Sequence, residues 1–324
     1  MWRNVHRELP PALFHYTDAA GLSGIVRSGN LWASHVYYVN DAHEFIYARG
    51  VINQAFDDRI EQSDASIGEK LKQLRASYRA HVSIWESIAD AYLVCFCEVG
   101  NLLSQWRAYA ANGEGFAVKF DPHKLMESLR SDTDVALQTK LFKVIYSAKE
   151  QREFIDLALD QLLLALEHSD AQEILSLVPL VFSEMAFSFK HNAFAEEREW
   201  RLVFTPRVSR VVDVRVKNGR LFPYATIPIC APEERPPYCA VMHGPTLESS
   251  NTTKALGILL GKAHPRFWVI LKSRVLTLHF GHADNLVRCR LLTISRLQSG
   301  NPPFNTTWPS RPRRSSGRSE FRNK

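Results

Sequence analysis

The chain has 324 residues and a formal net charge of +6, with 40 Lys and Arg against 34 Asp and Glu. Its 45% hydrophobic and 11% aromatic residues exclude a mostly disordered chain. The basic excess lies in residues 265–324, which hold 12 Lys and Arg but 2 Asp and Glu, so the mildly acidic body gives no electrostatic argument for nucleic-acid binding.

The first third of the body predicts short strands separated by helices. After a lead-in over residues 1–12, strands are expected at 13–16 and 31–34. Between them, Thr17-Asp18 can cap a helix that Gly29 ends. Asn40-Asp41 is expected to open the next helix, and mostly polar helices continue to about residue 90.

The rest of the body continues the same mixture. Helices are expected at 102–111, twice within 150–189 with a break near Ser169-Asp170, and at 252–260. Strands are expected at 91–97, 116–120, 142–146, 200–204, 211–216, 221–229, 240–243 and 267–271.

This order predicts an α+β fold, with a mixed or antiparallel central sheet of short strands and inserted helices, because no βαβ alternation runs the whole length. One domain is expected over residues 13–272, with helical insertions at about 41–90 and 150–190. Residues 273–324 form a basic extension, predicted to be disordered from about residue 299. That extension is a candidate for weak nucleic-acid contact.

Cysteine usage and hydropathy predict a cytoplasmic location without membrane contact. The five cysteines are odd in number and form no CxxC pair, which favours reduced thiols. The longest apolar stretch, 174–189, is interrupted by Ser, Pro and Glu184 and is shorter than the roughly 20 residues of a spanning helix.

Eight short motifs follow one another in a fixed order. They are His15-Tyr16-Thr17, Leu31-Trp32-Ala33-Ser34, Asn40-Asp41 with Glu44, Cys95-Phe96-Cys97-Glu98, Ser104-Gln105-Trp106 with Tyr109-Ala110, Gly115 to Asp121, Glu197 to Arg201, and His243-Gly244-Pro245. In this order they resemble the bacterial Domain of Unknown Function 2971 family over roughly residues 13–271. Ala42, Cys97 and Gln105 depart from the family's usual Pro, Ser and Met.

The same pattern is similar, more distantly, to the ADP-ribosyltransferase fold, and this second step is an analogy. It implies NAD as co-substrate, a nucleotide-type small molecule as ligand, an unidentified acceptor, no metal and a role in bacterial conflict or phage defence. Its site residues would be Glu199 as the first catalytic candidate, Glu197 as the second, and His15.

Cleavage of the nicotinamide–ribose bond builds positive charge on the ribose, which a carboxylate can stabilise. Glu199 offers that carboxylate, His15 a donor to the ribose, and Tyr16 a ring for the cationic nicotinamide. If Trp200 faces the core, strand alternation places Glu199 and Arg201 together on the other face, where the arginine keeps the carboxylate ionised. Glu197 is expected to share that face of the strand, one step earlier.

Other polar and aromatic groups complete the expected ligand site. Asn40, Asp41 and Glu44 could contact ribose hydroxyls, an acceptor or a metal, and Thr17 and Trp106 belong to the same motifs. Each also has a structural interpretation. Tyr16 and Trp106 can pack in the core, and Thr17, Asn40-Asp41 and Ser104 can cap helices.

Two other functions fit the same residues. The chain could be a non-catalytic module that binds a ligand or partner. It could also be a metal-dependent hydrolase or nuclease that uses Asp41, Glu44, Glu197 and His15. The transferase hypothesis requires His15, Tyr16 and Glu199 to line one cleft, and it fails if Glu199 points away from His15.

Overall fold

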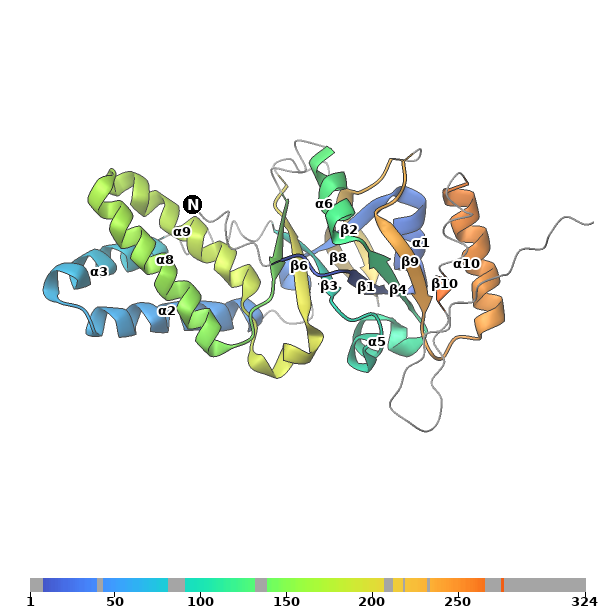
Figure 1. Ribbon diagram of the computed structural model, residues 1–324, viewed down its shortest axis with the longest axis horizontal. Helices are drawn as coiled ribbons and strands as arrows, with labels where there is room; N and C mark the ends of the chain where they lie inside the picture. The colour runs from blue at the N-terminus through green and yellow to red at the C-terminus, as the bar shows by residue number, and fades with distance from the viewer. Residues whose placement is uncertain are drawn as a thin grey trace, which may run out of the picture. The chain divides into compact units, whose positions relative to one another are not determined.

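The computed structural model describes residues 8–39, 43–80, 91–131, 139–206, 212–217, 219–231, 234–265 and 275–276 (Figure 1). Contacts divide the chain into the units Met1–Leu292 and Thr293–Lys324, and every described residue belongs to the first. The strand expected at 267–271 and the extension expected over 273–324, apart from residues 275–276, lie outside the described residues.

Ten strands of the described chain form one sheet in which all neighbours are antiparallel except β10 and β9. The main path runs β10-β9-β4-β1-β3-β2-β8-β7, and β6 and β5 branch from β3. The strands are β1 (Leu13–Thr17), β2 (Asn30–His35), β3 (Tyr92–Cys97), β4 (Phe116–Phe120), β5 (Thr139–Lys143), β6 (Glu199–Phe204), β7 (Val212–Lys217), β8 (Arg220–Pro228), β9 (Tyr238–His243) and β10 (Val275–Leu276).

Strand β3 is the branch point of this sheet. Along one edge it pairs with β6 over its whole length. Along the other edge it pairs with β2 through Leu93 and Tyr92, and with β1 through Cys97. We call the stretch of β3 between Leu93 and Cys97, where β1 and β2 separate from one another, the fork.

Along the chain, each described helix lies between two consecutive strands (Figure 1). They are α1 (Ala19–Ser28), α2 (His43–Glu61), α3 (Ala65–Ala80), α5 (Leu103–Tyr109), α6 (Pro122–Ser131), α8 (Ala148–His168), α9 (Ala171–Ser188) and α10 (Ser249–Ala263), with short 3-10 turns η2 (Val36–Tyr38), η4 (Ala111–Gly113) and η5 (Asn192–Glu197).

Local chemistry explains where several helices begin and end. The Asp18 side chain accepts from Gly21 N at the start of α1, and Gly29 ends that helix with φ of 65°. Asp170 caps α9 directly after α8 ends. These boundaries confirm the caps predicted at Asp18 and Gly29 and the break predicted near residues 169–170.

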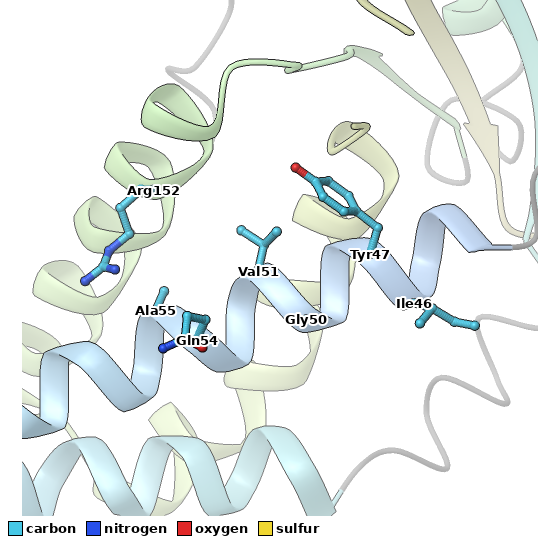
Figure 2. A pocket seen from close by; sticks show the side chains of 7 residues that line it. All are labelled: Ile46, Tyr47, Gly50, Val51, Gln54, Ala55 and Arg152. Carbon is cyan, nitrogen blue, oxygen red and sulfur yellow. The ribbon is translucent and has the colours of Figure 1, made fainter. Parts of the chain in front are cut away.

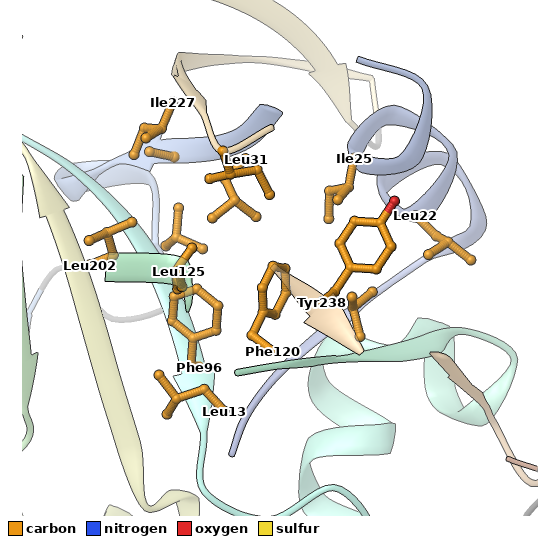
Figure 3. Packing of buried hydrophobic residues seen from close by; sticks show 14 of the residues in the cluster. Leu13, Leu22, Ile25, Leu31, Phe96, Phe120, Leu125, Leu202, Ile227 and Tyr238 are labelled. Atoms are coloured by element: carbon orange, nitrogen blue, oxygen red, sulfur yellow. The ribbon is translucent and has the colours of Figure 1, made fainter. Parts of the chain in front are cut away.

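One hydrophobic core joins the sheet to α1, α6 and α10. Figure 3 shows Leu13, Leu31 and Phe96 from the strands packed with Leu22 and Ile25 from α1. A second core joins α2, α3, α8 and α9 to the other face of β3 and β6, through Leu93 and Val203. Burial of these apolar side chains is the main stabilising term of the fold.

The α+β class and the antiparallel sheet of short strands are confirmed. One strand is displaced, because β5 spans Thr139–Lys143 and residues 142–146 were expected. None of the helices in the described part of the chain is both long and apolar enough to span a bilayer.

Candidate functional site

Five charged side chains meet beside the branch point of the sheet, and we call them the buried charge cluster. They are Glu44, Lys190, Glu197, Glu199 and Arg201. Lys190 Nζ lies 2.8 Å from Glu44 Oε1, 2.6 Å from Glu197 Oε2 and 3.1 Å from Glu199 Oε2. Charges removed from water persist only when paired in this way.

Arg201 makes the second set of contacts in the cluster. Its Nε and Nη2 each donate to one oxygen of Glu199 at 2.9 Å, a bidentate pairing. Its Nη2 also pairs with Glu44 Oε2, and its Nη1 donates to the Phe187 carbonyl at 3.3 Å. The predicted Glu199–Arg201 neighbourhood on β6 is therefore present, with Trp200 in the sheet core on the opposite face.

Four separate segments bring these charges together. Glu44 lies in the first turn of α2, Lys190 follows α9, Glu197 ends η5, and Glu199 and Arg201 belong to β6. Arg198, with φ of 44°, turns the chain between Glu197 and β6. Glu197 therefore reaches the cluster from a 3-10 turn and not, as expected, from the same strand as Glu199.

The surroundings of Glu199 favour its ionised form. Burial alone would raise its pKa, but the charge and hydrogen bonds of Arg201, the charge of Lys190 and a bond with Cys95 lower it to about 2. The pKa of Lys190 is raised, because the attraction of Glu199, Glu44 and Glu197 outweighs desolvation. Glu199 is thus a firmly held anion.

Glu197 is the carboxylate of the cluster with the most solvent contact, with 18% of its side chain exposed against 8% for Glu199. Burial raises its pKa, against the lowering effect of Lys190. Tyr109 Oη donates to it across a long 3.5 Å.

Cys95, Tyr109 and Tyr146 surround the cluster with weakly acidic groups. Burial raises the pKa of all three, and the negative charge of Glu199 adds to the shift. Tyr146 Oη accepts from the backbone N–H of Glu199 at 3.0 Å. A thiol with a raised pKa is a poor nucleophile, so Cys95 contributes packing and a hydrogen bond.

His15 does not join this cluster. Phe14 is opposite Cys97, and Cys97 is opposite Glu199, so these three residues share one face of the sheet. His15 lies on the other face, where its ring is 5.8 Å from that of Phe96. The single cleft required of His15, Tyr16 and Glu199 is therefore absent, because neighbouring residues of β1 point to opposite faces.

The His15 ring is held at the fork. Its Nδ1 lies 2.9 Å from the Cys95 carbonyl, which can only accept, so Nδ1 carries the hydrogen and Nε2 is left as an acceptor in the neutral ring. Burial lowers the pKa of His15, and the charge of Arg215 lowers it further. His15 is therefore a neutral acceptor near an arginine.

Tyr16 and Thr17 have structural surroundings. The Tyr16 hydroxyl donates to the Val99 carbonyl at 2.8 Å and accepts from Leu102 N at 3.1 Å. Its ring packs edge-on against Trp106 at 5.0 Å. Thr17 ends β1, and its neighbour Asp18, not Thr17, is the N-cap of α1.

The contacts of the other predicted site residues can be compared with their structural interpretations in the same way. Trp106 is fully buried and donates to Asn101 at 3.0 Å, so its packing interpretation is the one that its contacts support. Ser104 was expected to cap α5, but Leu102 occupies the cap position, and Ser104 Oγ donates to Glu196. Asn40 and Asp41 lie outside the described residues.

The sequence did not indicate Lys190, although it contacts all three carboxylates of the cluster. Its signal is a lone lysine directly after an apolar helix, and such a lysine usually lies at the surface. Within the described ranges, no group of three or more His, Cys, Asp or Glu is arranged to hold a metal ion. Glu44 and Glu197 converge instead on a lysine.

A pocket of about 470 Å³ lies near the cluster, between α2 and α8 (Figure 2). Ile46, Tyr47, Gly50 and Val51 line it from α2, directly after Glu44. Its charged wall residue, Arg152, already pairs with Asp58 and with Asp156. The pocket is therefore mainly apolar and contains none of the predicted site residues.

Comparison with known proteins agrees with the motif pattern. Residues 105–202 match the family described as Protein of unknown function (DUF2971), which confirms the resemblance to this family over that part of the chain. The matched range contains Lys190, Glu197, Glu199 and Arg201. No curated protein and no solved structure matches the chain.

Proposed function

We propose that this protein is a module that binds a small ligand at the fork, and that the buried charge cluster holds its fold together. The observation that carries this proposal is the saturation of Glu199. Both of its oxygens accept from Arg201, one also pairs with Lys190, and the residue is 7% exposed.

A carboxylate that stabilises an oxocarbenium ion must face the ribose across about one hydrogen-bond length. Glu199 would have to break a bidentate pairing and leave Arg201 without that partner, which is costly in a buried site. The Tyr16 ring is 6% exposed and packs against Trp106, so it is not free to stack on nicotinamide. These contacts favour a structural role for Glu199 and argue against NAD cleavage.

The fork offers groups that are better suited to a ligand. His15 presents the acceptor Nε2, and Arg215 lies within electrostatic reach of it. We also place the protein in the cytoplasm, which is supported by the free state of Cys95, Cys97, Cys230 and Cys239 in the described chain.

The test is nicotinamide release from NAD by the wild type, Glu199→Gln and the exposed control Glu153→Gln. We expect no release from any of the three, and unaltered NAD in the presence of candidate protein and nucleic-acid acceptors. Release by the wild type and by Glu153→Gln, lost in a folded Glu199→Gln, would overturn the proposal and restore the transferase hypothesis.

A further inference from the structure

Arg215, in the middle of β7, holds its guanidinium over two aromatic rings. The centre of the group is 5.8 Å from the ring of Trp32 and 5.8 Å from that of Tyr224. Nη2 donates to Ser34 Oγ at 2.8 Å. These contacts from β2 and β8 fix the plane of the guanidinium and point it in one direction.

The charge of this guanidinium has no carboxylate partner among the described residues. Its Nε is buried and has no hydrogen-bond partner there, although buried donors are nearly always paired. No described salt bridge includes Arg215. A partly desolvated cation with an unused donor is a feature that a bound anion would satisfy.

The nearby acids are engaged elsewhere. Burial lowers the pKa of Arg215, and the charge of Asp18 opposes this only from a distance, since the Asp18 side chain accepts from Gly21 N as the cap of α1. Asp213 Oδ1 accepts from Val214 N, and its Oδ2 accepts from Tyr224 Oη at 3.4 Å. Neither carboxylate is therefore positioned to neutralise the guanidinium.

We propose that Arg215 and Ser34 form a binding site for a phosphoryl group of a small molecule. The site rests on the proposed function, since it names the chemical class of the ligand bound at the fork. A planar guanidinium presents adjacent N–H donors that match two phosphoryl oxygens. The Ser34 hydroxyl, which accepts from Arg215, retains its hydrogen for a third oxygen.

His15 can report on occupancy of the site, because the charge of Arg215 reaches its ring. The negative charge of the ligand would offset Arg215, which otherwise disfavours protonation of the ring. Binding should therefore raise the pKa of His15.

The experiment is isothermal titration of the full chain with inorganic phosphate and, separately, with ADP. Arg215→Met is compared with Arg220→Met, which removes the same charge from an exposed position on β8. We expect Arg215→Met to weaken binding of both probes by roughly 10- to 100-fold, and Arg220→Met by less than about 3-fold. Tighter Arg215-dependent binding of ADP would identify a nucleotide, and equal binding would identify a free phosphate.

A second measurement keeps the proposal falsifiable if Arg215→Met does not fold. Arg215→Lys retains the charge but loses the Nε donor, and it should still weaken phosphate binding about 10-fold. The NMR pKa of His15 should rise on addition of phosphate to the wild type. Absence of phosphate and ADP binding, or equal losses in the Arg215 and Arg220 variants, would overturn the site. Neither result involves nicotinamide release, so failure of the site is distinct from failure of the proposed function.

Discussion

Glu199 has the charge expected of a catalytic carboxylate, but its surroundings make it a structural anion. It shares Arg201 with Glu44 and Lys190 with Glu44 and Glu197, so it contacts both cations of the cluster. Replacement by a neutral amide would leave four formal charges in the buried cluster, and Arg201 would lose the anion that its Nε and Nη2 both contact. Pairing of this kind is costly to break from one side.

We therefore predict that Glu199→Gln lowers the free energy of unfolding by roughly 3 kcal/mol at pH 7. The exposed control Glu153→Gln on α8 should change it by less than about 0.5 kcal/mol. Urea denaturation of both variants measures these values. A loss no larger than that of the control would show that the cluster does not stabilise the fold.

The carboxylate of Glu199 also makes the stability of the fold depend on pH. The pKa of Glu199 falls from 4.5 to about 2 on folding, so its contribution to stability is present above pH 4.5 and is lost as the pH falls towards 2. The difference between wild type and Glu199→Gln should narrow over that range. A difference that stays constant from pH 7 to pH 3 would contradict the low pKa.

At the scale of elements, alternation and caps were sufficient to predict most of the sheet. The period of two in β6 correctly placed Trp200, Leu202 and Phe204 in the sheet core, opposite Arg201. The site was harder to predict, because its members come from distant segments. Glu44 and Arg201 are 157 positions apart, and no local pattern links them.

Two errors have a local physical cause. His15 and Tyr16 were assigned to one cleft, although consecutive strand residues point to opposite faces. Glu197 was assigned to the strand of Glu199, but the chain turns at Arg198 through the left-handed region. A left-handed arginine has no strong sequence signature, because Gly or Asn normally occupies such a position.

The turn at Arg198 gives a prediction for this element. Glycine adopts a φ of 44° without a Cβ clash, so Arg198→Gly should stabilise the fold by up to about 1 kcal/mol, after the entropic cost of glycine in the unfolded chain. Arg107→Gly, in the interior of α5, should instead cost about 1 kcal/mol. Thermal unfolding of both variants measures the contrast, and equal destabilisation would contradict the strain at Arg198.

Over the whole molecule, the excess positive charge and the described hydrophobic cores lie in different parts of the sequence. Residues 293–324 hold 7 Lys and Arg and 1 Glu, so a chain ending at Leu292 has a formal net charge of zero. The buried residues of all three described core clusters lie between Leu13 and Leu260. The basic charge is therefore carried by residues that contribute nothing to the described cores.

We predict that the full chain binds double-stranded DNA weakly and in a salt-dependent way, and that a chain ending at Leu292 loses this binding but keeps the unfolding midpoint of the full chain. Binding of this kind scales with the number of phosphates neutralised by Lys and Arg. Fluorescence anisotropy at low and physiological salt measures the binding, and circular dichroism measures the midpoint. In a full-length control, Arg311, Arg313, Arg314, Arg318 and Arg322 are replaced by Gln, which should abolish binding without shortening the chain. If the shortened chain bound DNA as well as the full chain, the contact would belong to the folded body, where the Arg215 site at the fork would be the first position to test.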